Sequence, residues 1–173
     1  MSNFSNFSNR IFSGTVVHGA KEGRKLGFPT LNMSLAGENA EFEKDFRAGV
    51  YTVICELHSF NIEHNNYTEP RKHLSRGYAR SHTNLLDDQL NSSTFANTPL
   101  YAGLLHYGPR STFGETKMQW EIYLLQFDAE VYDYQVSFIV LEKLRDSVKF
   151  SSLEELITQM KLDKRQGEAE LLV

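Results

Sequence analysis

The 173-residue sequence predicts a mainly β fold, in which an antiparallel sheet closes or nearly closes into a barrel and one α-helix packs outside it near the C-terminus. Several stretches are rich in β-branched and aromatic residues, and glycine or proline separates them, which is typical of strands. Most successive stretches have no helical segment between them. Because parallel neighbours need long crossovers, usually with a helix, an antiparallel arrangement is favoured.

Five strand candidates follow one another along the chain. The first, residues 11–18, precedes a loop that carries three glycines. The second, residues 49–57, contains the single cysteine, Cys55, for which the apolar surroundings predict a buried rather than a reactive thiol. The remaining candidates are residues 100–107, 117–127 and 135–144, with a turn expected at 128–130.

Helical periodicity is strong only near the C-terminus. Four apolar residues recur there at the i, i+3, i+4, i+7 spacing of an amphipathic helix: Leu153, Leu156, Ile157 and Met160. Just before them, either Ser151 with Glu154 or Ser152 with Glu155 fits a capping box. The sequence therefore predicts one helix that follows the β body.

Composition limits the partners of the chain. The 18 lysines and arginines against 22 acidic residues leave a net charge of −4, and nucleic-acid binding depends on clustered cations, so we expect no nucleic-acid partner. No segment approaches the roughly 20 apolar residues that span a bilayer, and no signal peptide is recognisable, so we expect a cytoplasmic monomer without a membrane partner. An anionic ligand would need backbone amides or a metal to help hold it.

The length suits a single domain, which we expect at 11–173. Residues 1–10 form a polar Ser-Asn-Phe repeat that predicts a flexible leader. Residues 58–99 are too long for an ordinary connection and predict an insertion. The insertion carries His58, His64, His73 and His82. Their wide spacing favours solvated loop histidines over a metal site.

A glycine-rich loop is the most informative stretch. Gly19, Gly23 and Gly27 are four residues apart with three cations among them, so the backbone can approach an anion closely. It is not a Walker loop, because Lys25 is followed by Leu26 and no helical pattern begins there. On spacing alone, an ordinary surface turn is the better interpretation.

The residues after this loop sharpen the prediction. Pro29 fixes the backbone before Thr30 and Asn32, and residues two apart in an extended segment point to the same face. Their side chains place two neutral oxygens side by side, which suits Mg²⁺ that also takes phosphate ligands. The alternative is that both side chains only satisfy the backbone of a turn.

In this order the motifs resemble the riboflavin kinase family. The resemblance rests on Gly-Thr-Val-Val-His-Gly at 14–19, Gly-Arg-Lys-Leu-Gly-Phe-Pro-Thr-Leu-Asn at 23–32, Gly-Val-Tyr at 49–51, and later motifs at 108–113, 121–127, 144–145 and 149–150. It covers nearly everything from Ile11 to about Arg165 except the insertion. It implies a six-stranded antiparallel Greek-key barrel with one C-terminal helix, and ATP-dependent phosphorylation of the riboflavin 5′-hydroxyl to FMN with a divalent ion, Mg²⁺ or similar.

The resemblance also implies roles for single residues. Gly19, Gly23, Lys25 and Gly27 would contact the nucleotide, although an exposed loop face explains Lys25 equally well. Thr30 and Asn32 would reach the metal and the phosphates. Glu121 would act as the general base, and its strand carries an otherwise largely apolar face, which points the carboxylate toward a core or pocket. Arg145 and Phe150 would border the flavin.

Other aromatic residues have two interpretations. Tyr101, Tyr107, Phe113 and Trp120 either stack on the flavin ring or fill the barrel, and core filling is favoured for each.

Some features depart from the family pattern. The loop usually read as Ile-Gly-x-x-Pro-Thr-Phe is Tyr-Gly-Pro-Arg-Ser-Thr-Phe at 107–113, with its proline displaced by two places. This change keeps a non-catalytic flavin- or nucleotide-binding barrel as the alternative, and a nucleic-acid-binding barrel as a third possibility that the acidic balance disfavours. Because residues 1–10 are too few for the adenylyltransferase domain of many bacterial relatives, we expect FMN formation without FAD synthesis.

Overall fold

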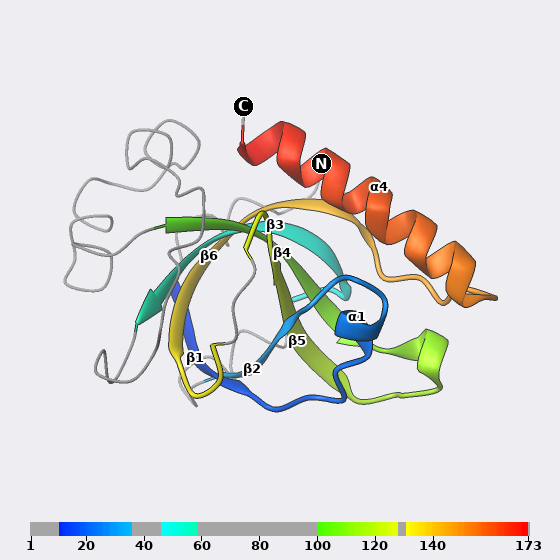
Figure 1. Ribbon diagram of the computed structural model, residues 1–173, viewed down its shortest axis with the longest axis horizontal. Coiled ribbons are helices and arrows are strands. Elements are labelled where there is room, and N and C mark those ends of the chain that lie inside the picture. Colours follow the sequence, from blue (N-terminus) through cyan, green and yellow to red (C-terminus); the bar gives the residue numbers. More distant parts are fainter. Residues whose placement is uncertain (1–10, 36–45, 59–99, 128–130, 173) are drawn as a thin grey trace.

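The computed structural model describes residues 11–35, 46–58, 100–127 and 131–172. Six antiparallel strands form a closed barrel with the order β1-β2-β5-β4-β3-β6, as predicted (Figure 1). The strands are β1 (Ile11–Val17), β2 (Leu31–Leu35), β3 (Gly49–His58), β4 (Leu100–Pro109), β5 (Met118–Leu124) and β6 (Gln135–Asp146). β3, β4 and β5 are neighbours in order, and β6 returns beside β3, which is a Greek-key arrangement. The expected leader and the turn at 128–130 lie outside the described residues.

Two elements differ from the strand and loop assignments made from the sequence. β2 was expected only as an extended segment, because its five residues are too few for a clear alternation. The glycine-rich stretch, expected as a loop, contains the single helical turn α1 (Glu22–Lys25). Gly27 ends it at φ 84°, and this left-handed conformation lets the Phe28 N–H donate to the Gly23 carbonyl at 2.8 Å.

The barrel interior is a continuous apolar core. Alternate residues of β5 point into it, among them Trp120 and Ile122, and Cys55 of β3 is fully buried. The predicted burial of Cys55 is confirmed, and this burial raises the pKa of its thiol. Tyr101, Tyr107 and Trp120 also belong to this core, which confirms that they fill the barrel. Phe113 does not, since it lies in the 3₁₀ turn Ser111–Phe113 outside the barrel.

Helix α4 (Leu153–Leu171) lies across the outside of the barrel (Figure 1). Its N-cap is Ser152, whose hydroxyl accepts a hydrogen bond from the Glu155 N–H at 3.2 Å, so the second of the two proposed capping pairs is correct. Leu153 is 44% exposed, contrary to the predicted apolar face. The buried residues of α4 lie farther along, at Asp163, Gly167 and Leu171.

Gly167 allows α4 to approach the barrel wall. A Cβ atom at this position would lie 2.7 Å from a methyl group of Leu104 in β4. Leu104 and Leu171 belong to a second apolar cluster, which fills the space between α4 and the outer face of the barrel. In the described part of the chain, no helix combines the length and apolar character needed to cross a membrane.

His58 is the last residue of β3. The sequence assignment ended this strand at residue 57, so the first residue of the predicted insertion belongs to the strand. His58 Nε2 lies 3.1 Å from Ser137 Oγ and 3.5 Å from Glu56 Oε2, so it is a strand residue with partners rather than a solvated loop histidine. Burial holds the pKa of His58 below its usual value. The other three histidines, at 64, 73 and 82, lie outside the described residues.

Candidate active site

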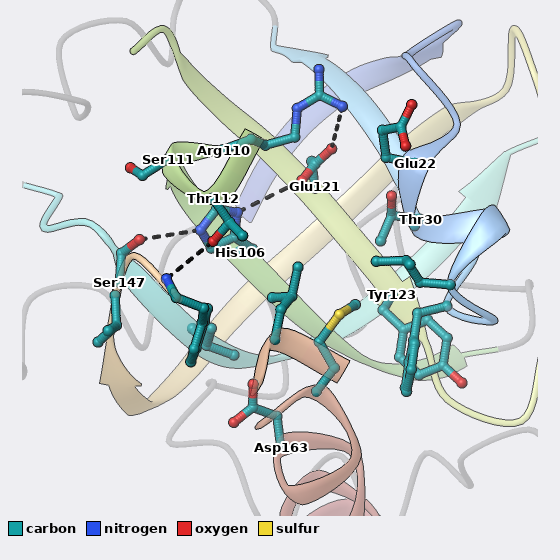
Figure 2. Close-up of a pocket in the computed structure, with 18 of the residues that line it drawn as sticks. Glu22, Thr30, His106, Arg110, Ser111, Thr112, Glu121, Tyr123, Ser147 and Asp163 are labelled. Carbon is teal, nitrogen blue, oxygen red and sulfur yellow. Dashed lines mark hydrogen bonds and ion pairs between the residues drawn. The ribbon is translucent and has the colours of Figure 1, made fainter. Parts of the chain in front are cut away.

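A pocket lies on the outer face of the barrel, bounded by strands β3 to β6, by α1, by the 3₁₀ turn and by the first half of α4 (Figure 2). Five of the residues predicted for the site line it: Gly23, Thr30, Glu121, Arg145 and Phe150. Gly19, Lys25, Gly27 and Asn32 do not. The structure therefore gathers the predicted base, one predicted metal ligand and both predicted flavin contacts into one cavity.

The strand register explains this gathering. Asn32 of β2 is the cross-strand partner of Glu121 of β5, and Glu121 is the partner of His106 of β4. His106 is in turn opposite Val50 of β3, which pairs with Arg145 of β6. Because side chains directly opposite one another share a face, these residues form one row around the outside of the barrel.

Glu121 is a well-shielded carboxylate in the pocket lining, with only 12% of its side chain exposed. Its Oε2 lies 3.7 Å from His106 Nδ1, and its Oε1 lies 4.0 Å from Arg110 Nη1 (Figure 2). Both distances exceed hydrogen-bond length, and no described residue donates a hydrogen bond to this carboxylate. A shielded carboxylate in this state has lone pairs ready to accept a proton from a ligand.

Arg110 is held away from Glu121 by a stronger partner. Its Nη2 lies 2.7 Å from Glu115 Oε1, and its Nε and Nη2 both donate to Glu115 Oε2, at 3.1 and 2.8 Å. Gln119 donates to the same carboxylate at 2.7 Å. Arg110 therefore contributes positive charge near Glu121 while its hydrogen bonds go to Glu115.

Sequence reasoning missed His106 and Arg110. His106 is the one polar ring in the mostly apolar stretch 100–107, on the face opposite to Leu105 and Tyr107, which point into the barrel. The period-2 alternation could have placed His106 outside the barrel. That Glu121 lies opposite His106 follows only from the register of β4 and β5.

The glycine-rich stretch has two distinct parts. Gly19 lies against Asn32, because a Cβ atom at position 19 would fall within 2.2–2.5 Å of the Asn32 amide group. Lys25 is 66% exposed and pairs at 2.8 Å with Glu22, a residue of the pocket lining, although Lys25 itself does not line the pocket. Thr30, which follows this stretch, lines both the pocket and a smaller cavity whose other lining residues include Arg24, Pro29 and Tyr132.

The guanidinium of Arg145 forms hydrogen bonds within the protein. Its Nε and Nη2 donate to Asp163 of α4 at 2.7–3.0 Å, and its Nη1 donates to the Asp146 carbonyl at 3.0 Å. The guanidinium carbon lies 5.8 Å from the centre of the Phe150 ring. Both residues border the pocket, but the hydrogen-bonding groups of Arg145 face α4.

Thr30 and Asn32 are the two oxygen ligands that the sequence predicts for a metal, and of the two only Thr30 lines the pocket. No group of three His, Cys, Asp or Glu side chains suited to a metal ion occurs within the described ranges. A neutral hydroxyl and an amide oxygen fit Mg²⁺, since this ion keeps several waters and takes phosphate oxygens as further ligands. The residues present thus fit a metal that arrives with a phosphorylated ligand.

Comparisons with known proteins place the chain among riboflavin kinases. A family model described as Flavokinase, riboflavin kinase, matches residues 8–171. The RNA-binding riboflavin kinase RibR of Bacillus subtilis is 27% identical over 155 residues, which are 88% of this chain and 47% of that protein. The bifunctional riboflavin kinase/FMN adenylyltransferase of the same organism is 26% identical over 160 residues, 91% of this chain and 37% of that protein.

Among solved structures, riboflavin kinase from Trypanosoma brucei superposes with a TM-score of 0.56 at 20% identity, covering 94% of this chain and 76% of that one, which shows a shared fold. The chain spans less than half the length of the two Bacillus subtilis relatives. The family model, in contrast, matches almost the whole of this chain. The chain therefore belongs to the riboflavin kinase family.

Proposed function

We propose that this protein transfers the γ-phosphoryl group of ATP to the 5′-hydroxyl of riboflavin, giving FMN and ADP. The observation that carries the proposal is Glu121, a shielded carboxylate that lines the pocket and receives no hydrogen bond from a described residue. Family membership supplies the reaction, and Glu121 supplies a group that can take up the proton that the reaction releases.

The flavin ring suits the side of the pocket toward α4. Apolar side chains dominate there, among them Phe113, Phe150, Leu156 and Met160. A planar isoalloxazine ring buries large apolar surfaces, which such a wall stabilises. With the ring on this side, the ribityl chain would extend along the barrel wall toward Glu121.

The nucleotide suits the side of Thr30 that faces the smaller cavity. Thr30 lies at the junction of the two cavities, so a phosphate placed there would be close to both substrates. The backbone of Gly19, Gly23 and Gly27 allows close approach of the phosphates, while Lys25 would contribute only long-range charge because it is exposed. Thr30 and Asn32 would hold the divalent ion, which when bound neutralises charge on the transferring phosphoryl group.

The phosphoryl transfer requires one proton acceptor from the protein. The 5′-oxygen forms a bond to the γ-phosphorus, the bond from that phosphorus to the β–γ bridging oxygen breaks, and ADP leaves. The hydroxyl proton passes to the Glu121 carboxylate. The shielded setting of Glu121 favours this role, since little water competes for its lone pairs.

Arg145 has a positioning role in this proposal. Its donors are taken by Asp163 and Asp146, so it would hold Phe150 against the flavin rather than bind the flavin itself. The backbone of Phe150 is held as well, because its N–H donates to Thr112 Oγ1 at 3.2 Å.

The test is to incubate the purified chain with riboflavin, ATP and MgCl₂ and to separate the flavins by chromatography. FMN that forms in proportion to protein, and only when all three components are present, supports the proposal. Tight riboflavin binding without any FMN would contradict it and favour the alternative, a non-catalytic flavin-binding barrel.

A further inference from the structure

We propose that His106 is a positioning residue that orients the Glu121 carboxylate, an inference that rests on the proposed function. His106 and Glu121 are direct cross-strand partners in β4 and β5. The imidazole Nδ1 is 3.7 Å from Glu121 Oε2, and the other ring nitrogen, Nε2, is 3.3 Å from Ser147 Oγ. His106 thus connects the proposed base to the segment between β6 and α4 (Figure 2).

The two neighbours of His106 define its tautomer. A carboxylate can only accept hydrogen bonds, so Nδ1 carries the hydrogen toward Glu121. The hydroxyl of Ser147 can donate, and it therefore donates to Nε2. In this tautomer Nδ1 already carries a hydrogen and Nε2 faces Ser147, so neither nitrogen is left to take the proton of a substrate hydroxyl. This arrangement assigns the proton transfer to Glu121 and orientation to His106.

The backbone next to His106 is shaped for this contact. Gly108 has φ 155°, and a Cβ atom there would lie 3.2 Å from Ser147 Oγ and 3.4 Å from His106 Nε2. A side chain at position 108 would therefore press on the Ser147–His106 pair. The absence of a side chain leaves room for the ring to lie between Glu121 and Ser147.

The contact with Glu121 is long without substrate and can shorten when substrate fills the pocket. Catalytic hydrogen bonds often tighten only in the substrate complex. A shift of less than 1 Å would bring Nδ1 within hydrogen-bond length of Oε2. With Oε2 held on one side, Oε1 is the oxygen left for the 5′-hydroxyl, since Arg110 stays paired with Glu115.

Two substitutions of similar shape distinguish the roles of the two ring nitrogens. In His106→Asn the amide nitrogen occupies the position of Nδ1 and keeps the donor toward Glu121. In His106→Gln the amide group reaches the position of Nε2, so the partner for Ser147 is kept and the donor toward Glu121 is lost. We expect His106→Gln to lower kcat about 10–100-fold with little change in KM for riboflavin, because misplacement of a reacting group by about 1 Å costs up to this much. His106→Asn should retain most of the kcat.

A double-mutant cycle with Glu121→Gln distinguishes positioning from a general structural role. If His106 acts through Glu121, His106→Gln will cause almost no further loss of kcat in a Glu121→Gln background. A structural role would multiply the two losses instead. Thermal unfolding and riboflavin binding of each variant verify that the fold and the pocket are intact.

The outcomes are distinct. Loss in His106→Gln, retention in His106→Asn and a non-multiplicative double variant support the inference. Wild-type FMN formation together with an undiminished His106→Gln, or with multiplicative losses, overturns the inference and leaves the proposed function standing. Failure of the wild-type chain to form FMN overturns the proposed function, and the role of His106 falls with it.

Discussion

Arg145 and Asp163 join the end of β6 to the middle of α4 by a two-pronged ion pair. Arg145 Nη2 lies 2.7 Å from Asp163 Oδ2, and Nε lies 2.9 Å from Oδ1. Asp163 is 6% exposed and also accepts a hydrogen bond from Gln159 at 2.9 Å. The pair lies at the edge of the pocket, so the position of α4 and the shape of the pocket depend on the same contact.

Removal of one partner should destabilise the protein strongly. We expect Asp163→Ala to lower the free energy of unfolding by about 3 kcal/mol, because the Arg145 guanidinium would be left shielded without its counter-ion. Urea denaturation measures this change. Lys164→Ala is the matched control, since the partly exposed Lys164–Glu168 pair at 4.0 Å should contribute less than about 1 kcal/mol. Equal effects of both variants would contradict the importance assigned to the Asp163 pair.

Glu121→Gln should lower kcat for FMN formation by roughly 10²–10⁴-fold, the usual contribution of a general base. The amide has nearly the same shape but cannot take up the proton, so riboflavin binding should change little. Steady-state kinetics with riboflavin titration separate the two quantities. Glu142→Gln, at an exposed position of β6, is the control and should behave like wild type. Near-normal turnover of Glu121→Gln would remove Glu121 from its proposed role.

Gly19→Ala should affect the nucleotide and not the flavin. The new methyl group would meet the Asn32 amide at 2.2–2.5 Å, and this side chain would have to move. We expect KM for MgATP to rise about tenfold, the equivalent of one lost hydrogen bond, with KM for riboflavin unchanged. Asn32→Ala should reproduce the effect, and the double variant should add nothing to it. An additive double variant would show that Gly19 acts independently of Asn32.

Alkaline pH should destabilise the native state through Tyr51. Burial, and then the negative charge of Asp146, raise the pKa of Tyr51 to about 12, and its hydroxyl donates to the Arg47 carbonyl. In the unfolded chain the phenol ionises near its ordinary pKa of about 10. The folded pKa is higher, so the stability from this group is full below about pH 10 and is lost as the pH rises to about 12.

The Tyr51→Phe variant isolates this contribution. Its free energy of unfolding should fall less steeply than that of the wild type between about pH 10 and 12, while the difference between the two proteins should stay constant at lower pH. Urea denaturation across this range supplies the comparison. Parallel alkaline slopes in the two proteins would show that Tyr51 ionises equally in the folded and unfolded chains.

Local sequence was sufficient for most of the fold. Stretches rich in β-branched and aromatic residues predict β1, β3, β4, β5 and β6, and the Ser152–Glu155 pair predicts the start of α4. These signals depend on neighbours within a few residues, which is why they can be recognised without the structure. β2 and α1 are too short for a periodic signal, and they depend on the barrel and on Gly27.

The candidate site likewise has features that the sequence predicts and features that depend on tertiary packing. The sequence by itself determined which residue types are available, with Thr30, Asn32 and Glu121 identified from local motifs and from family resemblance. Only the tertiary structure decided that His106 lies opposite Glu121 and that Arg145 donates its hydrogen bonds to Asp163. The physical reason is register: alternation determines the face that a side chain takes, but packing of the closed barrel determines which strand residues meet across that face.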